Sequence, residues 1–418
     1  MRILFSGHNT CHNRGCEALV RSTLQAVREH WPDARVELPS RTPEADARIL
    51  GDLGSRVRVS ARQPSAAERL VTRAQRQGWP GARHFLWPGP VPAGWRRRWQ
   101  QVDLIMAVGG DNYTLDYGIP SGVIGFDAVA ARAGVPVVLW GASVGPFGTL
   151  PAYERAVRRG LSRYVLIGAR ESVTLDDLQW RLRLPNVRPM VDPAFFLTPG
   201  ELPAPLLRSP VAEARRVVGI NLSPLVAARA ESQAAFHAQA LELLRGLLMD
   251  PGTVVVLIPH VTDPNDPARS DYTLHAQLAA ASGLDADQRA RLVVLDDRLG
   301  AAASKAAVQR CDLLLTARTH LAIAGYSQGV PVVALGYSRK AAGLTRDVYG
   351  DAELHLAAAD FSAERAQTAL AQAEARREEL RAAAVAYGAA GRETNWSVLG
   401  DLHAWLSRRA SAGRGHGA

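Results

Sequence analysis

Cysteine, lysine and long apolar runs are all scarce in this 418-residue chain. Its three cysteines do not build a disulfide framework, and Cys11 and Cys16 lack the spacing and further ligands of a metal finger. No apolar run approaches the roughly 20 residues that span a bilayer. The opening segment MRILFSGHN is too short for the apolar region of a signal peptide. These absences predict a cytoplasmic protein.

The charge of the chain is positive and carried almost entirely by arginine. The formal net charge is +9, and only Lys305 and Lys340 among the 49 basic residues are lysine. Such a charge suits acidic small molecules or an anionic membrane face. Nucleic acid is not expected as a partner, because no nucleic-acid motif is present and the arginines are dispersed along the chain. With 47% hydrophobic and 21% charged residues, the composition is that of an ordinary globular protein.

A strand–helix alternation occurs twice along the chain. The two series are separated by a proline-rich stretch from Leu197 to Arg216, which lacks a clear period and predicts a linker. Alternating strands and helices are typical of parallel sheets. The sequence therefore predicts an α/β protein with two Rossmann-like domains facing across a cleft and with C-terminal helices. The predicted boundaries are 1–198 for the N-terminal domain, 199–216 for the linker, 217–360 for the C-terminal domain, 361–409 for the helices and 410–418 for a disordered tail.

The first series consists of short apolar strands that end in small or polar residues. The predicted strands are Arg2–Ser6, Ala34–Leu38, Asp103–Val108, Val135–Trp140, Val165–Gly168 and Met190–Asp192, with helices at Glu17–His30 and Val173–Trp180. Ligands of parallel sheets bind beyond the carboxyl ends of the strands, so the exit loops are expected to form part of a site. The candidate residues in these loops are Asn13, Gly15, Glu17, Gly109, Gly110, Asp111, Asn112 and Arg170.

The second series repeats this pattern. The predicted strands are Val217–Leu222, Thr253–Pro259, Arg291–Leu295, Asp312–Thr316 and Val330–Tyr337, with helices near Gln233–Met249 and Leu274–Ala281. Asn221 and His260 lie at strand ends and are candidate substrate contacts. For His260, a structural histidine is an equally good interpretation.

The stretch from Asp312 to Lys340 gives the strongest functional signal. Arg318 and His320 follow one strand at the start of a helix, where the backbone favours anions. Arg339 and Lys340 follow the next strand and are expected to reach the same crevice. A guanidinium, an imidazole and an ammonium at one helix start predict a site for a small, strongly acidic substrate. A solvated surface group is the alternative interpretation of Arg318.

Two further stretches carry weaker signals. The loop HVTDPNDPARSD holds His260, Asp263, Asp266 and Asp271, but it lacks the glycine and the terminal glutamate of an EF-hand loop, so no metal site is predicted. Residues 61–99 combine arginines with several aromatics. They are interpreted either as an interfacial patch that meets anionic lipid or a lipid-linked acceptor, or as a solvated excursion whose tryptophans pack on the domain, which we favour.

Several segments, taken in order, resemble the polysaccharide pyruvyl transferase family. They are NRGCEAL (13–19), VGGDNY (108–113), WGASVGPF (140–147), GARES (168–172), VDPAF (191–195), GINLSP (219–224) and TARTHLAIAGYSQGVPVVAL (316–335). The resemblance leaves out residues 61–99 and the region beyond about 355. It implies a GT-B-like fold. It also implies transfer of the enolpyruvyl unit of phosphoenolpyruvate to two hydroxyls of a sugar in a cell-surface polysaccharide or its precursor, which gives a pyruvate ketal and phosphate.

The resemblance implies roles for the candidate cations. Arg170 and Arg318 are expected to grip the phosphate and the carboxylate of the donor, with Lys340 or Arg339 as a further cation. His320 is the expected acid that protonates the methylene carbon, because histidine titrates near neutrality. No cofactor is expected beyond phosphoenolpyruvate, the donor substrate.

The acceptor is a sugar, an oligosaccharide or a lipid-linked saccharide, and it is expected on the N-terminal domain. Asp111 or Glu17 is the expected base for its hydroxyl. Cys16 stands where family members often have an acidic residue, which implies a different acceptor or a sub-branch of the family, with Glu17 taking over the part of that residue. Contact with the inner face of the membrane through residues 61–99 is a further expectation.

Two other functions stay open at this point. A nucleotide-sugar-dependent glycosyltransferase on the same fold would bind UDP or GDP in the C-terminal domain. A non-catalytic module would bind acidic glycans or a membrane surface through residues 61–99. The set of Arg318, His320 and Lys340 is more cationic than a sugar-nucleotide pocket requires, which favours the pyruvyl transferase.

Overall fold

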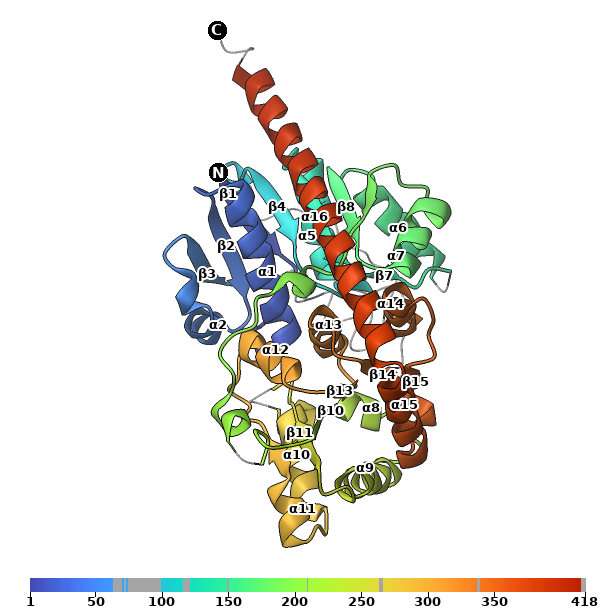
Figure 1. Ribbon diagram of the computed structural model, residues 1–418. Helices are drawn as coiled ribbons and strands as arrows, with labels where there is room; N and C mark the ends of the chain where they lie inside the picture. Colours follow the sequence, from blue (N-terminus) through green and yellow to red (C-terminus); the bar gives the residue numbers. More distant parts are fainter. Residues whose placement is uncertain are drawn as a thin grey trace. The chain divides into compact units, whose positions relative to one another are not determined.

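A computed structural model describes residues 1–62, 70, 73, 99–115, 121–148, 150–208, 210–262, 266–336 and 339–414, with the backbone alone at 121–124, 339–340, 410 and 412–414. The contacts divide the chain into two compact units (Figure 1). Unit 1 comprises Met1–Thr10, Leu19–Pro193 and Gly391–Ala418. Unit 2 comprises Cys11–Ala18 and Ala194–Ala390. Compared with the predicted domains, residues 11–18 belong to unit 2 and residues 391–418 to unit 1.

Unit 1 is built on a seven-stranded parallel sheet with the strand order β3-β2-β1-β4-β6-β8-β9. This is the order of a Rossmann-like sheet with a seventh strand added. Strands covered on both faces are apolar throughout, as in β4, where all four residues are buried. The strands are β1 (Arg2–Ser6), β2 (Arg35–Ser40), β3 (Val57–Ala61), β4 (Leu104–Ala107), β6 (Val137–Ala142), β8 (Leu166–Ala169) and β9 (Val187–Pro189), with a separate parallel pair of β5 (Tyr113–Thr114) and β7 (Val144–Gly145).

The helices of unit 1 bury apolar stripes against this sheet. Val129 of α5 and Tyr153 and Val157 of α6 belong to one core cluster with residues of β4, β6 and β8. Residues 14–18, the first turn of α1, cluster with unit 2. The helices are α1 (Arg14–His30), α2 (Pro43–Ile49), α5 (Ser121–Arg132), α6 (Pro151–Leu161) and α7 (Ser172–Asp176), with the 3₁₀ turn η1 (Gly51–Leu53), the π-turn η3 (Asp177–Arg181) and the end of α16 (Arg377–Arg414).

Unit 2 has a six-stranded parallel sheet with the order β12-β11-β10-β13-β14-β15, again a Rossmann-like arrangement. The strands are β10 (Arg216–Asn221), β11 (Thr253–Leu257), β12 (Leu292–Val294), β13 (Leu313–Thr316), β14 (Val332–Gly336) and β15 (His355–Ala357). The helices are α8 (Pro224–Ala227), α9 (Gln233–Leu248), α10 (Asp271–Ala281), α11 (Ala286–Ala290), α12 (Ala301–Gln309), α13 (Thr319–Ser327), α14 (Arg339–Tyr349), α15 (Ala363–Ala375) and the start of α16. Four 3₁₀ turns are η4 (Pro193–Phe196), η5 (Ala204–Leu207), η6 (Pro267–Arg269) and η7 (Ala358–Asp360).

Side-chain caps fix several helix starts in unit 2. Ser232 accepts a hydrogen bond from the amide of Ala235 at the start of α9, and Ser362 accepts one from Arg365 at the start of α15. Such caps satisfy amide groups that the first turn of a helix leaves without partners. A serine therefore fixes the first residue of α9 and of α15.

The α/β class is confirmed, and every predicted strand except one lies within two residues of an observed strand. The prediction of a strand at Met190–Asp192 was wrong, because the strand there is β9 at Val187–Pro189. The side chain of Asn395 accepts a hydrogen bond from the amide of Val191 and donates one to its carbonyl. These are the backbone groups that pairing in a sheet would need. The strands β3 and β15 were not predicted.

The C-terminal helices are confirmed, but their division differs from the prediction. Two helices and a disordered tail were expected after residue 361, whereas α16 runs without a break for 38 residues to Arg414. Gly391 lies within α16, and a Cβ there would come within 2.3 Å of Val191, so this glycine permits close packing of the helix. In the described part of the chain, no helix is both long enough and apolar enough to cross a membrane.

Candidate active site at the strand ends

The candidate residues occur in two groups, one at the carboxyl edge of each sheet. The group in unit 2 follows β10, β11 and β13 and includes the start of α1; the group in unit 1 follows β4, β6 and β8. The carboxyl edge is where the ligands of open α/β sheets bind. The two groups differ in charge: three carboxylates surround the arginine of unit 1, whereas the arginine of unit 2 pairs with Asp271 and lies in a group with two histidines.

Arg318 in unit 2 is fixed by a buried carboxylate. It is the N-cap residue of α13, and its Nη2 donates to Oδ1 of Asp271 at 2.7 Å while its Nε lies 3.2 Å from both carboxylate oxygens. The Asp271 side chain is 0% exposed. Arg318 is therefore not the solvated surface group of the alternative interpretation. Its guanidinium points in a direction that Asp271 sets.

Asp271 also ties the neighbouring strand ends together. It accepts hydrogen bonds from the amides of His260 and Val261 and from Nδ2 of Asn221. Burial raises the pKa of Asp271, but the charge of Arg318 and its hydrogen bonds outweigh burial and hold the pKa below its ordinary value. The sequence showed Asp271 only as part of an acidic loop. In the structure this carboxylate orients Arg318.

His320 lies in the first turn of α13 and is packed against Gly15. A Cβ at Gly15 would come within 2.4 Å of the His320 Nδ1 and within 2.6 Å of its Cγ, so only glycine admits the imidazole in this position. Oδ1 of Asn13 accepts the amide of Gly15 at 2.9 Å and so caps α1. The hydrogen bond from Gly15 to Asn13 thus fixes the backbone that packs against the imidazole of His320.

His260 follows β11 and is 4% exposed. Neither of its ring nitrogens has a hydrogen-bond partner among the described residues. Burial lowers the pKa of His260 to about 3, and the nearby His320 and Arg318 add to this effect. The imidazole is therefore neutral at pH 7, which differs from a structural histidine with satisfied ring nitrogens.

Glu17 is committed to the start of another helix. Its Oε2 accepts the amide of Ala301 at 2.9 Å, at the N-terminus of α12, and its side chain is 1% exposed. Arg14 lies 3.6 Å from Glu17 and donates to the carbonyls of Cys11 and Asp297. A carboxylate at a helix N-terminus satisfies free amides and offsets the helix dipole. This contact leaves Glu17 poorly suited to the role of a base for the acceptor.

Arg339 and Lys340 begin α14, but their side chains lie outside the described residues. Their expected contact with the same crevice therefore stays a prediction. Asn221 is fully buried and donates to the Ile258 carbonyl as well as to Asp271, so its observed contacts hold strand ends together.

Arg170 dominates the group in unit 1 and is surrounded by acids. Its Nη1 donates to Asp192 at 2.7 Å and its Nη2 to Asp111 at 2.9 Å, while its Nε lies 3.5 Å from Glu171. Nε also donates to Ser143. Burial alone would lower the pKa of Arg170, but the three carboxylates raise it above its ordinary value. With three acids around one guanidinium, this edge does not favour a phosphate.

The glycine loop after β4 is filled by its own asparagine. Nδ2 of Asn112 donates to the carbonyl of Gly7 at 2.8 Å, and a Cβ at Gly109 would overlap this amide group. The carbonyl of Gly110 accepts the amide of Ser143 at 2.8 Å. These contacts join the ends of β1, β4 and β6. The side chain of Asp111 is 36% exposed and that of Glu17 only 1%, so Asp111 is the more accessible of these two candidate bases.

Sequence reasoning missed the pairing of the two arginines with the acids around them. Asp192 and Glu171 lie in segments that resemble the family, but nothing in their spacing indicated that they pair with Arg170. It also missed a buried pair in unit 1, where Nε2 of His8 and Oδ2 of Asp46 lie 2.7 Å apart. No sequence signal predicts this pair, because the two residues are 38 positions apart.

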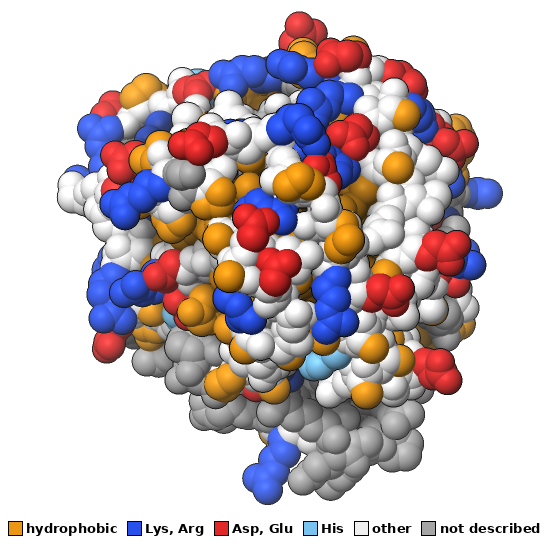
Figure 2. Space-filling model, turned by 60° about the horizontal axis from the view of Figure 1, so that its bottom comes forward, with side chains coloured by type: hydrophobic (Ala, Val, Ile, Leu, Met, Phe, Trp, Pro, Cys, Tyr) orange, Lys and Arg blue, Asp and Glu red, His pale blue; other side chains and the backbone are white. Residues whose placement is uncertain are grey.

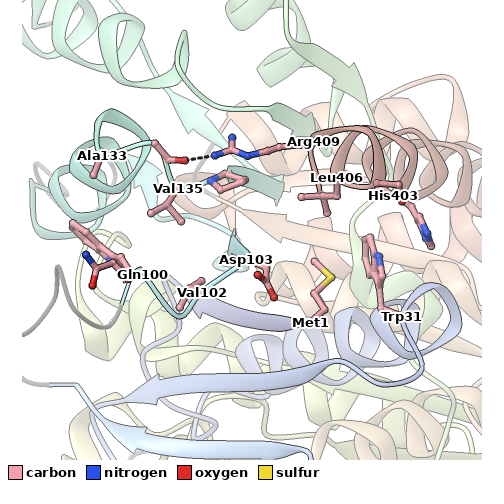
Figure 3. A pocket seen from close by; sticks show the side chains of 14 residues that line it. Met1, Trp31, Gln100, Val102, Asp103, Ala133, Val135, His403, Leu406 and Arg409 are labelled. Carbon is pink, nitrogen blue, oxygen red and sulfur yellow. Dashed lines mark hydrogen bonds between the residues drawn. The ribbon is translucent and has the colours of Figure 1, made fainter. Parts of the chain in front are cut away.

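A groove of about 800 Å³ lies at the opposite edge of the unit 1 sheet (Figure 3). Met1 precedes β1, Asp103 precedes β4 and Val135 precedes β6, so the lining marks the amino ends of these strands. Trp31 and His403 stack there with their ring centroids 5.5 Å apart. The groove contains none of the candidate residues, and we do not assign the chemistry to it.

Most of residues 61–99, the expected membrane patch, lies outside the described residues. Trp99, at its end, is 4% exposed and packs edge-on against Phe126, as the excursion interpretation predicts for that tryptophan. Among the described side chains on the face in Figure 2, basic and acidic groups are interspersed and form no continuous basic stripe. This face gives no support to nucleic-acid binding.

Solved structures share this fold over almost the whole chain. A UDP-N-acetylglucosamine 2-epimerase from Neisseria meningitidis, bound to UDP-GlcNAc, aligns with a TM-score of 0.58 and 11% identity over 96% of this chain and 99% of that one. HepE from Anabaena, in complex with UDP, aligns with a TM-score of 0.52 and 16% identity over 99% and 100%. The two Rossmann-like sheets and these likenesses define a GT-B-like fold, as predicted.

The family is shown by the sequence comparison. The family model described as polysaccharide pyruvyl transferase matches residues 13–339, and the chain belongs to this family. The amylovoran biosynthesis protein AmsJ of Erwinia amylovora is 24% identical over 370 residues, which cover 83% of this chain and 86% of the relative. The protein is thus a transferase of polysaccharide biosynthesis, and the predicted family and enzyme class are confirmed.

Proposed function

We propose that this transferase moves the enolpyruvyl unit of phosphoenolpyruvate onto two hydroxyls of a sugar in a polysaccharide or its precursor. The products are a pyruvate ketal and phosphate. The observation that carries the proposal is the strand-end cluster of unit 2, where Arg318, His320 and His260 gather beside the start of α13 in a member of this family. The donor is strongly anionic, and a guanidinium at a helix N-terminus suits such a ligand.

Arg318 would bind the donor with a fixed orientation. Asp271 occupies Nε and Nη2, so Nη1 is the nitrogen that takes no part in the pair. The carboxylate offsets part of the charge of Arg318. Arg318 would therefore serve mainly to orient the donor, and Arg339 or Lys340 would supply further positive charge.

His320 would act as the acid of the first step. Its imidazolium gives a proton to C3 of the donor, which leaves cationic character at C2. The first sugar hydroxyl then bonds to C2 and loses its proton to a base. The second hydroxyl replaces the phosphate at C2. One of the two hydroxyl protons restores the imidazolium and the other leaves with the phosphate, so that atoms and charge balance.

Asp111 is the base that we propose for the acceptor hydroxyl. It is partly exposed, whereas Glu17 is buried and holds the amide of Ala301. The acid-rich edge around Arg170 would suit a neutral, hydroxyl-rich acceptor better than the donor. We therefore assign Arg170 to holding this edge together and Arg318 to the donor.

A nucleotide-sugar-dependent glycosyltransferase is the second candidate function. The observation in its favour is that solved neighbours of the same fold, such as HepE, hold UDP. At a sequence identity of 16% or less, these neighbours show a shared fold but do not show that this chain binds the same ligand. A direct comparison of ligands separates the two candidates.

The test is a thermal-shift titration of the full chain with phosphoenolpyruvate, UDP-sugars and GDP-sugars. A ligand at 100 times its Kd stabilises the folded state by about 2.7 kcal/mol, which raises the melting temperature measurably. We expect a shift from phosphoenolpyruvate that Arg318→Lys loses, because lysine keeps the charge near Asp271 but not the fork. Arg298→Lys, at an exposed arginine paired with Asp296, is the matched control and should keep the shift. A shift from a sugar nucleotide alone would make the chain a glycosyltransferase.

A further inference from the structure

His260 is held in place by its backbone while its ring has no partner. Its amide donates to Asp271 at 3.1 Å, and its carbonyl accepts the amide of Arg14 at 3.0 Å. Both ring nitrogens lack hydrogen bonds to described residues, and the side chain is almost fully buried. Buried polar groups are nearly always satisfied, so an imidazole left in this state indicates a ligand that completes it.

Charged groups reach this ring from three elements. His320 and Arg318 belong to the start of α13, Arg14 to the start of α1, and Asp271 to the start of α10. Asp271 pairs with Arg318, and Glu17 lies 3.6 Å from Arg14. These two arginines are therefore largely neutralised by their own carboxylates before any ligand binds.

We propose that His260 forms the phosphate subsite of this edge and takes up a proton from solvent when a phosphate dianion binds. This inference rests on the proposed function, because it concerns the phosphate of the same donor. A neutral imidazole offers one N–H donor and one acceptor nitrogen, and phosphate oxygens accept hydrogen bonds. Protonation gives the ring a positive charge, so the N–H that faces the phosphate makes a stronger, charge-assisted hydrogen bond to it.

The charge of a bound phosphate dianion is large enough to protonate His260 at pH 7. Burial, followed by the charges of His320, Arg318 and Arg14, lowers the pKa of His260 to about 3, and Asp271 opposes them. At an effective dielectric constant of about 20, each negative charge placed roughly 4 Å away raises a pKa by about 3. A dianion therefore brings the pKa of His260 to neutrality or above. Binding should then consume a proton at pH 7 and weaken as the pH rises.

The experiment is calorimetry on the full chain with phosphoenolpyruvate and, separately, inorganic phosphate. Each titration is run at pH 7 in three buffers that differ in ionisation enthalpy. The slope of binding enthalpy against ionisation enthalpy gives the number of protons taken up. We expect close to one proton per phosphoenolpyruvate and a smaller net uptake for inorganic phosphate, because the part that is still monoanionic at pH 7 releases a proton when it binds as the dianion. Binding of phosphoenolpyruvate without proton uptake would overturn this inference and leave the proposed function standing.

Two variants assign the proton. His260→Gln should abolish the uptake and weaken both anions about tenfold, because one hydrogen bond to a charged group is lost. His275→Gln, at a buried histidine that bonds the backbone of Leu222, is the control and should keep the uptake. Uptake that persists in His260→Gln but disappears in His320→Gln would move the proton to His320 and overturn the assignment. Absence of binding by both anions to the unmodified chain would overturn the proposed function as well.

Discussion

The carboxyl edges of the two sheets both contain an arginine paired with a buried carboxylate, yet the charge around the two arginines differs. Arg170 in unit 1 lies among Asp111, Asp192 and Glu171, whereas Arg318 in unit 2 pairs, among the described residues, with Asp271. Unit 2 adds two imidazoles to its arginine. Under the proposed function, Arg170 holds its edge of the fold together and Arg318 faces the donor. The number of surrounding carboxylates is the difference on which this proposal rests.

Two buried aspartates sharpen the same comparison. Asp127 in unit 1 accepts a hydrogen bond from Tyr113, and burial raises its pKa to about 6 because it outweighs the hydrogen bonds and the charge of Arg62, which lower the pKa. Asp271 in unit 2 has Arg318, which outweighs burial and lowers its pKa. The two acids should therefore give opposite dependence of stability on pH.

Removing the unit 1 arginine should have the largest effect on stability. Arg170→Met leaves three carboxylates without their cation, and breaking a buried ion pair costs about 4 kcal/mol of the free energy of unfolding. Urea unfolding measures this loss. Arg181→Met, at a partly exposed pair with Glu154, is the control and should cost less than about 1 kcal/mol. A stable Arg170→Met protein that no longer binds phosphoenolpyruvate would show that Arg170 grips the donor after all.

Removing the unit 2 carboxylate should affect both stability and turnover. Asp271→Asn keeps the shape but leaves Arg318 without its charge partner, at a cost of about 3 kcal/mol. We expect phosphate release from phosphoenolpyruvate to fall about 100-fold, because a misplaced guanidinium no longer orients the donor. The exposed Asp296→Asn is the control. Unchanged kcat and KM in Asp271→Asn would separate Arg318 from the chemistry.

The pH dependence of the two aspartates is a test with opposite signs. Asp127 binds its proton more tightly in the folded state, so its contribution to stability falls by about 3 kcal/mol as the pH rises from about 4 to 6. Asp127→Asn should remove this fall. The contribution of Asp271 is present above its unfolded pKa and is lost as the pH drops through its lowered folded pKa. Denaturant unfolding from about pH 2 to pH 8 covers both windows, and it would contradict this view if Asp127→Asn had the same profile as the unmodified chain.

The sequence predicted strands and strand-end loops well because these depend on local patterns. Apolar runs such as Thr253–Leu257 identify buried strands wherever they occur in the chain. The partners of the candidate residues depend on long-range contacts that no spacing reveals. Asp271 lies 47 positions from Arg318, and Asp111 lies 59 from Arg170. Both arginines were therefore predicted as equal clamps, whereas the structure places different numbers of carboxylates around them.

The smallest expected change in stability comes from a single methyl group in the first loop. In Gly15→Ala the new Cβ would meet the ring of His320 at less than 3 Å, so the imidazole must move away from its place at the start of α13. Stability should fall by only about 1 kcal/mol, because a partly exposed ring can move. Turnover should fall at least tenfold, because the proposed acid no longer reaches the donor. Gly400→Ala in α16 has open space around its Cβ and should leave turnover unchanged. Equal activity in both variants would mean that His320 does not need the position that Gly15 provides, and the case for it as the acid would lose its geometric basis.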